Sequence, residues 1–269
     1  MTLSYSRILG RKASRAAQNL ICPHLGWNQE RYGNVLHQHL QPGGNTRWLE
    51  AGCGHRILPN GLESIEKLAV KQARFVVGMD MDWSSLRTHR SIGRRVKASM
   101  SGVPFADESF DLVGCNMVAE HLEDPGQCLA ELTRVLAPNG VLLIHTPNIR
   151  NYMVFLNHAV SRLLPRHWMA SFVHSAEQRA QEDVFPALYR MNSAEKLRQA
   201  ARDLGLQIES EEFLTGPRPF FAFFLPLALI QLIILRLLAL PRLSKFQTTI
   251  LVVMRKPVHP AVIAARAVA

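Results

Sequence analysis

Cysteine is scarce in this sequence and gives no sign of a metal site. The 269 residues contain four cysteines, and none stands in a C-x-x-C pair or at another spacing typical of metal ligands. Two of them fall in segments expected to be a buried strand and a tight loop. We therefore expect free thiols, a reducing compartment and no zinc or other metal.

The N-terminal residues lack acidic side chains and also lack a continuous apolar core. Residues 1–20 hold four basic residues among serines and alanines: Arg7, Arg11, Lys12 and Arg15. This pattern excludes a secretory signal. Three interpretations are open for the basic segment 1–26: a solvated tail, a basic helix on anionic lipid, or a transit peptide. Because nothing else in the sequence indicates an organelle, we expect a cytoplasmic protein.

Aromatic side chains are not interleaved with the basic ones. The formal net charge is +10 and the isoelectric point is near 10.0, which indicates an anionic partner, either nucleic acid or a membrane surface. A dedicated nucleic-acid surface combines clustered basic residues with aromatics. Nucleic acid is therefore the less favoured partner.

The segment 47–54 ends in two glycines one residue apart and lacks a third. An apolar run closes on Glu50, followed by Gly52 and Gly54. This predicts a buried strand and then a tight loop where the backbone approaches a ligand. A dinucleotide-binding turn needs a third glycine, and Ile57 stands in its place. The loop therefore fits an amino-acid cofactor beside an adenosine better than a dinucleotide.

A second apolar run, residues 73–80, ends in Asp80 at 26 residues beyond Gly54. In strand–helix–strand proteins an acidic residue near this place binds the two ribose hydroxyls. The alternative is a solvated carboxylate at a strand end. The helix expected between the two strands makes the spacing a little long, but ribose binding is the favoured role.

Apolar strand patterns alternate strictly with helical patterns along the chain. The predicted helices span 27–40, 64–72, 83–95, 125–136 and 195–204. The predicted strands span 47–50, 73–80, a short stretch within 94–100, 110–116, 141–145, 207–213 and 247–254. Gly140 is expected to end the fourth helix in a left-handed conformation. Such alternation indicates an α/β protein with a parallel sheet and helices on both faces.

Five motifs occur in a fixed order, and together they resemble those of a known family. They are E-A-G-C-G at 50–54, V-G-M-D at 77–80, V-P-F-A-D-E-S-F-D at 103–111, H-L-E-D-P at 121–125, and L-A-E-L-T-R-V-L-A-P-N-G at 129–140. Residues 27–148 thereby resemble class I S-adenosylmethionine-dependent methyltransferases of the small-molecule, type 11-like branch. The resemblance implies a Rossmann-like, doubly wound sheet of seven strands, mostly parallel with an antiparallel last strand. It also implies a domain over 27–257 and a tail at 258–269.

The resemblance implies a role for particular residues around S-adenosyl-L-methionine. The residues implied for cofactor binding are Glu50, Gly52, Cys53, Gly54, Asp80, Met81, Ser99, Met100 and Asn116. The residues of the first motif would surround the amino-acid part of the cofactor. Asp80 would bind the ribose, Met81 would lie against the adenine, and Asn116 would lie under the sulfonium.

Two positions depart from the family pattern. Ser99 stands where the family usually has an Asp that contacts the adenine amine, next to Met100, whose backbone N–H would face the ring. A serine still accepts a hydrogen bond, but the charge-assisted contact is lost, which predicts weaker cofactor binding. Arg56 replaces a glycine that is common in the first motif.

Methyl transfer from a sulfonium depends mainly on the alignment of acceptor and methyl carbon. A base is needed only when the acceptor must lose a proton. His121 is the candidate base, because an imidazole accepts a proton near neutral pH. Two alternatives for His121 stay open, packing of the loop and a hydrogen bond to the cofactor. His145, inside a strand, is expected to be a core histidine.

Two apolar segments follow the fifth strand. Residues 150–190 are rich in aromatics and stand where this family inserts its substrate lid, which indicates an apolar or ring-bearing acceptor, although the aromatics would equally form the lid's own core. Residues 219–240 are long and apolar enough to cross a bilayer. The strands on both sides belong to one sheet, however, so the segment is expected to lie in the membrane interface, to return as a hairpin at Pro226, or to pack on its own domain. Bilayer contact is favoured over packing.

The sequence therefore predicts a methyltransferase for a small, lipophilic acceptor at a membrane surface. One alternative is a non-catalytic protein of the same fold within an assembly, which the two departures would support. The other is an RNA methyltransferase, which the charge would support. The chain has no appended RNA-binding module and no Asn/Asp-Pro-Pro-aromatic motif.

Overall fold

The computed structural model describes residues 2–22, 28–41, 43–152, 185–215 and 224–258, with side chains in the first range from residue 12 onward. Most of the predicted lid at 150–190 lies outside the described residues. So do the start of the apolar segment 219–240 and the tail from residue 259.

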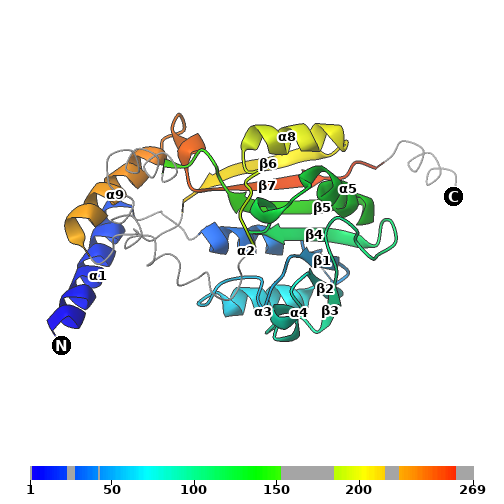
Figure 1. Ribbon diagram of the computed structural model, residues 1–269, viewed down its shortest axis with the longest axis horizontal. Coiled ribbons are helices and arrows are strands. Elements are labelled where there is room, and N and C mark those ends of the chain that lie inside the picture. The colour runs from blue at the N-terminus through cyan, green and yellow to red at the C-terminus, as the bar shows by residue number, and fades with distance from the viewer. Residues whose placement is uncertain (1, 23–27, 42, 153–184, 216–223, 259–269) are drawn as a thin grey trace.

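One seven-stranded sheet forms the centre of the molecule (Figure 1). Its strand order is β3-β2-β1-β4-β5-β7-β6. The first five strands in this order pair in parallel, and β7 runs antiparallel to both of its neighbours. The strands are β1 (Arg47–Ala51), β2 (Phe75–Asp80), β3 (Arg94–Lys97), β4 (Phe110–Asn116), β5 (Leu136–Pro147), β6 (Gln207–Leu214) and β7 (Thr249–Arg255). The predicted doubly wound, mostly parallel sheet with an antiparallel last strand is confirmed.

Helices cover both faces of this sheet. One apolar core cluster packs α2, α3 and α4 on one face, and a second packs α5 and α8 on the other. The helices are α1 (Thr2–Ile21), α2 (Asn28–Gln38), α3 (Glu63–Gln72), α4 (Trp83–Arg87), α5 (Pro125–Val135), α8 (Ala194–Asp203) and α9 (Leu225–Leu238), with short 3-10 turns η1 (Ala119–His121) and η2 (Ser244–Phe246). The carboxyl ends of the parallel strands consequently share one edge, which is where the candidate site lies.

The predicted helix over 83–95 is shorter than the sequence pattern indicates. It begins after Asp82, whose carboxylate accepts hydrogen bonds from the first N–H groups, and ends at Arg87. Beyond that point the Arg95 guanidinium donates to three carbonyl oxygens within residues 87–92. A side chain thus satisfies carbonyl oxygens that would have been hydrogen-bonded within a longer helix. The apolar pattern of the sequence does not predict such a contact.

The predicted left-handed residue at the end of α5 is also placed differently. The helix ends at Val135, and β5 follows without a gap. Asn139, with φ of 64°, takes the left-handed conformation, whereas Gly140 does not. Gly140 meets a different constraint, because a Cβ there would lie 2.7 Å from the Ala137 carbonyl oxygen. The glycine permits close packing in place of a turn.

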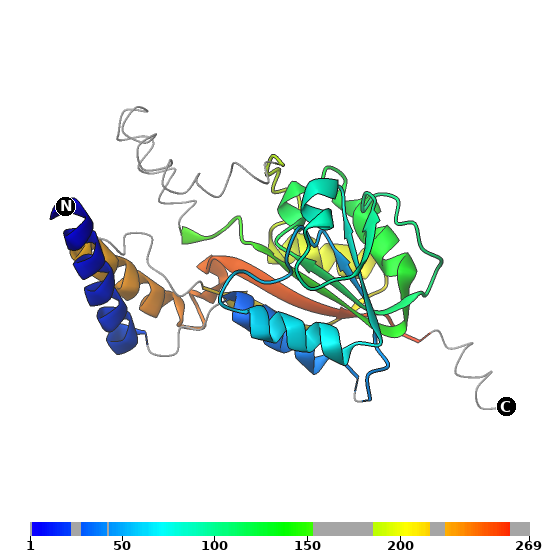
Figure 2. The ribbon, with the colours of Figure 1, turned by 90° about the horizontal axis from the view of Figure 1, so that it is seen from below.

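The two terminal segments form a separate pair of helices. α1 and α9 lie side by side at one end of the molecule in both Figure 1 and Figure 2. Cys22 and Ile21 pack against Leu232 and Leu235 of α9. The solvated-tail interpretation is therefore wrong for the end of α1. No helix among the described residues is both long and apolar enough to cross a bilayer.

Gly114 of β4 gives a direct test of the core. A Cβ at this position would lie 2.0 Å from Glu50 Oε2 and 2.6 Å from the Tyr32 hydroxyl. We expect Gly114→Ala to lower the free energy of unfolding by about 1 to 3 kcal/mol, since overpacking forces the buried carboxyl group to move. Urea denaturation measures this difference.

Gly93→Ala is the matched control, because a Cβ there has no atom within 4 Å. Its free energy of unfolding should stay within about 0.5 kcal/mol of that of the parent. Equal midpoints for the two alanine variants would contradict the packing described around Glu50.

Candidate functional site

The glycine loop follows β1 and is held by the neighbouring strand. The N–H groups of Gly52 and Cys53 both donate to the Met79 carbonyl oxygen, at 2.7 and 3.2 Å. Gly52 has φ of 73°, and a Cβ on it would lie 2.5 Å from a methyl of Val118. Only glycine satisfies both the backbone angle and the close approach.

Asp80 joins the same loop from the end of β2. Its two carboxylate oxygens accept from the N–H groups of Gly54, at 2.8 Å, and Asp82, at 2.9 Å. Gly54 itself has φ of 52°, and a Cβ there would meet nothing within 4 Å. The loop therefore presents backbone to open space beside a carboxylate. This arrangement can receive a ligand that carries hydroxyl groups.

Glu50 lies beneath the loop and not on its surface. The side chain is 1% exposed, and its carboxyl group accepts hydrogen bonds from the Tyr32 hydroxyl at 3.1 Å and the Trp48 indole at 3.1 Å. Burial raises the pKa of Glu50 to about 8, although both hydrogen bonds act in the opposite direction. In the structure Glu50 therefore supports the loop from below.

The other residues expected near the adenosine follow β2 and β3. Ser99 lies one residue beyond Ala98, whose N–H donates to the Asp80 carbonyl oxygen. The Ser99 hydroxyl is already paired with the Ser101 hydroxyl at 2.8 Å. The Met100 side chain is buried, whereas Met81 is 55% exposed next to Asp80. The fold thus gathers these positions at one edge of the sheet.

Cys53, within the glycine loop, and Arg56, just after it, each contact a different residue. The Cys53 thiol is buried against Gly78, where a Cβ would lie 2.7 Å from Sγ. Arg56 donates to the Asn60 side chain at 3.3 Å. Arg56 therefore has a partner outside the glycine loop.

Asn116 at the end of β4 is held by three elements. Its Nδ2 donates to Gln29 Oε1 of α2 at 2.7 Å and to the Ile57 carbonyl oxygen at 2.9 Å. His145 Nδ1 lies 2.8 Å from Asn116 Oδ1, and His145 Nε2 lies 3.1 Å from the Thr249 hydroxyl. Burial lowers the pKa of His145 to about 3. The neutral imidazole can thus donate to Asn116 and accept from Thr249.

His121 lies in η1, five residues beyond Asn116. Its Nδ1 is 3.4 Å from the Pro186 carbonyl oxygen and its Nε2 is 4.0 Å from Glu120 Oε1. Glu120 is buried and accepts from the Thr146 hydroxyl at 3.2 Å. Burial raises the pKa of Glu120. His121 remains partly exposed at 31% of its side chain, so its ring is available to a ligand.

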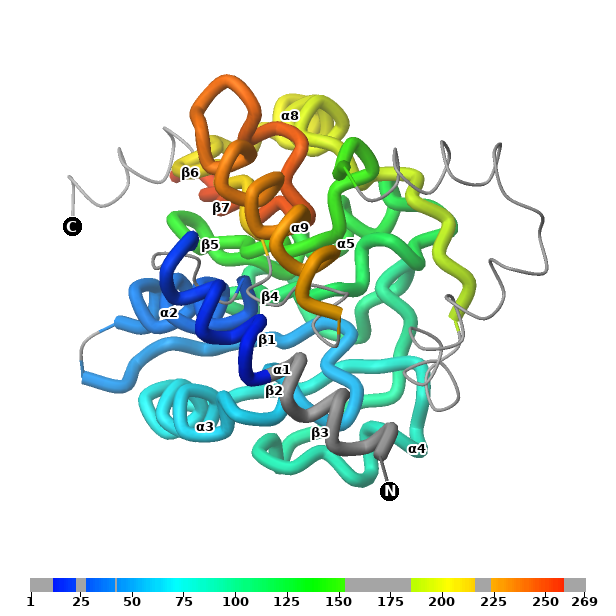
Figure 3. The backbone as a smooth tube through the Cα atoms, turned by 90° about the vertical axis from the view of Figure 1, so that its left-hand side faces the viewer, coloured from blue at the N-terminus to red at the C-terminus, as the bar shows by residue number. Residues whose placement is uncertain are grey.

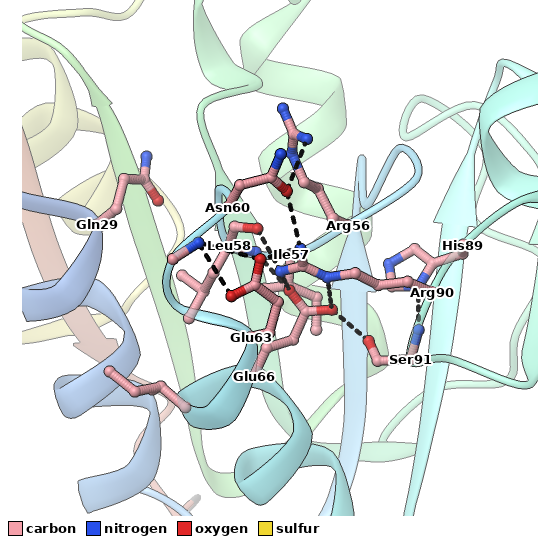
Figure 4. A network of polar contacts seen from close by, with 12 residues as sticks. Gln29, Arg56, Ile57, Leu58, Asn60, Glu63, Glu66, His89, Arg90 and Ser91 are labelled. Carbon is pink, nitrogen blue, oxygen red and sulfur yellow. Dashed lines mark hydrogen bonds and ion pairs between the residues drawn. The ribbon is translucent and has the colours of Figure 1, made fainter.

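A polar network anchors the chain that follows the glycine loop (Figure 4). The buried Glu66 carboxylate accepts from the Leu58 N–H, from Ser91 Oγ and from the Arg90 guanidinium. Arg90 also donates to the Leu58 carbonyl oxygen and to Asn60. The loop is thereby fixed to α3 and to the segment before β3.

Sequence reasoning missed the residues that support the site from within. Tyr32, Gln29, Glu66 and Arg90 contribute through side-chain contacts between elements far apart in the chain. One of these residues could have been found from the sequence. Glu66 lies three positions before Ala69, so both lie on the buried side of α3. Such an acid needs a buried partner.

Three features are typical of doubly wound proteins that bind a nucleotide-like cofactor: the strand order, the glycine loop, and Asp80 at the end of the neighbouring strand. Comparison with known proteins makes this specific. Residues 49–144 match a family model described as a methyltransferase domain. A Mycolicibacterium smegmatis protein described as a probable S-adenosylmethionine-dependent methyltransferase is 38% identical over 103 residues, which are 37% of this chain and 37% of that protein.

Two further comparisons agree on the fold. A Bordetella bronchiseptica protein named ubiquinone biosynthesis O-methyltransferase is 32% identical over 168 residues, 57% of this chain and 63% of its own length. The crystal structure of the cyclase SpnF superposes with a TM-score of 0.54 at 15% identity, covering 94% of this chain and 97% of that one. The chain spans between 37% and 63% of the length of these two sequence relatives. Over residues 49–144 the chain is similar to S-adenosylmethionine-dependent methyltransferases.

The raised pKa of Glu50 predicts a pH dependence of stability. Between its ordinary pKa of 4.5 and about 8, the folded protein keeps the Glu50 proton while the unfolded chain loses it. Stability should therefore fall as pH rises through this window, by up to about 1.4 kcal/mol per pH unit. Glu50→Gln cannot ionise and should lack this component.

Urea denaturation of both proteins at several pH values between 5 and 8 measures the effect, because their difference isolates position 50 from other titrating groups. We expect the stability of the parent relative to Glu50→Gln to decline steadily with rising pH. A difference that is constant across the window would show that Glu50 is already ionised in the fold.

Proposed function

We propose that this chain is an S-adenosylmethionine-dependent methyltransferase that acts on a small, lipophilic acceptor at a membrane surface. The observation that carries the proposal is the open backbone at Gly54 beside Asp80. A left-handed glycine with free space over it lies against a carboxylate that ends the next strand. This is the arrangement that a ribose-bearing ligand requires.

The residues around the loop fit the cofactor of this family. Asp80 is the candidate acceptor for the ribose hydroxyls, and Met81 lies exposed next to it as the candidate adenine contact. Gly52, Cys53 and Gly54 supply the backbone beside the amino-acid end. The bound cofactor would supply an electrophilic methyl group and its own leaving group.

The contribution of the protein to catalysis is alignment. Asn116 is fixed from both sides by Gln29 and His145, so its amide does not rotate freely near the proposed methyl position. His121 lies on the same edge with a partly exposed ring. We assign it as the base that takes a proton from a hydroxyl acceptor.

Two observations bear on the nature of the acceptor. The predicted lid at 150–190, most of which lies outside the described residues, is rich in aromatic residues. Relatives from Bordetella are named ubiquinone biosynthesis O-methyltransferase. The aromatics favour an apolar acceptor, and the name of these relatives favours oxygen as the methyl-accepting atom.

A non-catalytic or differently catalytic role is the second candidate. The superposition with the cyclase SpnF shows that this fold also serves proteins not named for methyl transfer. The Ser99 hydroxyl is already engaged with Ser101, which is consistent with a changed adenine contact. Binding of radiolabelled S-adenosylmethionine separates the candidates, because a scaffold need not bind the cofactor.

An RNA methyltransferase is a third candidate, supported only by the net charge of +10.

Asp80→Ala should weaken binding of S-adenosylhomocysteine by about a hundredfold or more. Two hydroxyl donors would lose a charged acceptor, and each such hydrogen bond contributes roughly 1.5 to 3 kcal/mol. Calorimetric titration measures the affinity. Asp203→Ala at the end of α8, an exposed acidic position on another helix, is the control and should bind as the parent does. Affinity within about threefold of the parent for Asp80→Ala would remove Asp80 from the site.

His121→Ala should slow turnover on the order of a hundredfold while leaving cofactor affinity nearly unchanged, since general bases contribute about this much. Single-turnover rates with the acceptor and calorimetry with S-adenosylhomocysteine give the two quantities. Equal losses in both would reassign His121 as a cofactor contact.

A further inference from the structure

The charge of this protein is divided sharply along the chain. All 21 acidic residues fall between residues 30 and 212, together with 20 of the 31 basic residues. Residues 1–29 contain four basic and no acidic residues, and residues 213–269 contain seven basic and no acidic residues. The domain itself is thus nearly neutral, and the terminal segments carry the excess positive charge.

The fold brings these two basic segments together as the α1–α9 pair. Cys22 donates its thiol hydrogen to the Leu232 carbonyl oxygen at 3.4 Å, and the buried face of α9 contacts α1 through Leu232 and Leu235. The exposed basic side chains of the described residues in the pair and the turns after it are Lys12, Arg15, Arg236, Arg242 and Lys245.

The opposite face of α9 is a continuous apolar stripe. Its exposed members recur every three or four residues and therefore share one side of the helix: Leu227, Ile230, Ile233 and Leu237. Ile230 and Ile233 are 55% and 53% exposed, and Leu240, two residues beyond the end of the helix, is exposed as well. Isolated exposed apolar residues need no explanation, but an aligned row of four flanked by basic side chains indicates a binding surface.

The pair is attached at the edge of the sheet that holds the candidate site. α9 comes between the end of β6 and the start of β7. Tyr152, five residues after the end of β5, packs against the same cluster and accepts a hydrogen bond from Gln231 at 2.8 Å. Figure 3 looks onto this end of the molecule, with α1 and α9 nearest the viewer. A surface bound by the pair would face the acceptor side of the site.

We propose that the α1–α9 pair is a docking surface for an anionic lipid bilayer, with the α9 stripe immersed at the headgroup boundary and the basic residues on anionic headgroups. This inference deepens the proposed function, since it assigns the membrane contact to specific residues. Apolar burial and attraction to anionic lipid act together in interfacial helices. A docked enzyme would take its acceptor from the bilayer.

Charge complementarity favours lipid over the other occupants. A second copy of this chain would bring one basic surface against another, and the like charges would repel. A nucleic acid would match the charge but would leave an aliphatic stripe without aromatic side chains for stacking.

Vesicle flotation of the full chain at neutral pH tests the proposal. We expect binding to vesicles of phosphatidylcholine mixed with phosphatidylglycerol, and much weaker binding to phosphatidylcholine alone. Ile230→Glu with Ile233→Glu should weaken partitioning by at least about tenfold, because two apolar side chains would no longer enter the lipid. Lys12→Gln with Arg15→Gln should weaken it by roughly fivefold for each residue.

Leu68→Glu is the matched control, because Leu68 is 51% exposed on α3 of the main domain. It should float as the parent does. All variants should keep the circular dichroism spectrum and the S-adenosylhomocysteine affinity of the parent, which shows that the domain is folded.

Unchanged flotation of the Ile230/Ile233 variant, or no binding of the parent to anionic vesicles, would overturn the proposal. Size-exclusion chromatography of the parent covers the remaining occupant: a dimer that this double variant dissociates would show that a second copy covers the stripe. A parent that binds vesicles but no S-adenosylhomocysteine would retain the docking surface and remove the proposed function.

Discussion

The buried carboxyl group of Glu50 is the constraint on which the centre of this molecule depends. It occupies the space that Gly114 leaves open in the next strand and is bonded to Tyr32 and Trp48. A buried polar group is tolerated only when its hydrogen bonds are satisfied. The residue thereby ties β1, β4 and α2 together directly below the glycine loop.

The strand ends above this carboxyl group are joined by polar contacts and not by apolar packing alone. Asp80 holds the glycine loop through the Gly54 N–H, and His145 holds Asn116 through its Nδ1. Groups that are held in this way do not have to be ordered when a ligand binds. An enzyme that accelerates its reaction by aligning the reactants depends mainly on such pre-organisation.

The division of charge gives the molecule two regions with different tasks. The sheet and its helices are nearly balanced in charge, whereas the α1–α9 pair carries basic residues beside an apolar stripe. Because the pair lies at the edge of the sheet where the candidate site is built, contact with an anionic surface and access of an apolar acceptor would occur on the same side. The position of the pair links the two parts of the proposed function.

The sequence by itself determined the alternation of strands and helices along the chain, the parallel sheet with helices on both faces, and the positions of Gly52, Gly54 and Asp80 at strand ends, because local periodicity and glycine spacing carry that information. The doubly wound arrangement followed from the resemblance of its motifs to a known family. Sequence reasoning placed the end of α4 and the left-handed residue near Gly140 incorrectly. Arg95 hydrogen-bonds the carbonyl oxygens beyond α4, and the glycine at 140 is required by the nearby Ala137 carbonyl oxygen. Only the tertiary structure decided that Glu50 is buried and that α1 packs on α9. Both depend on contacts between residues distant in the chain, which no local pattern records.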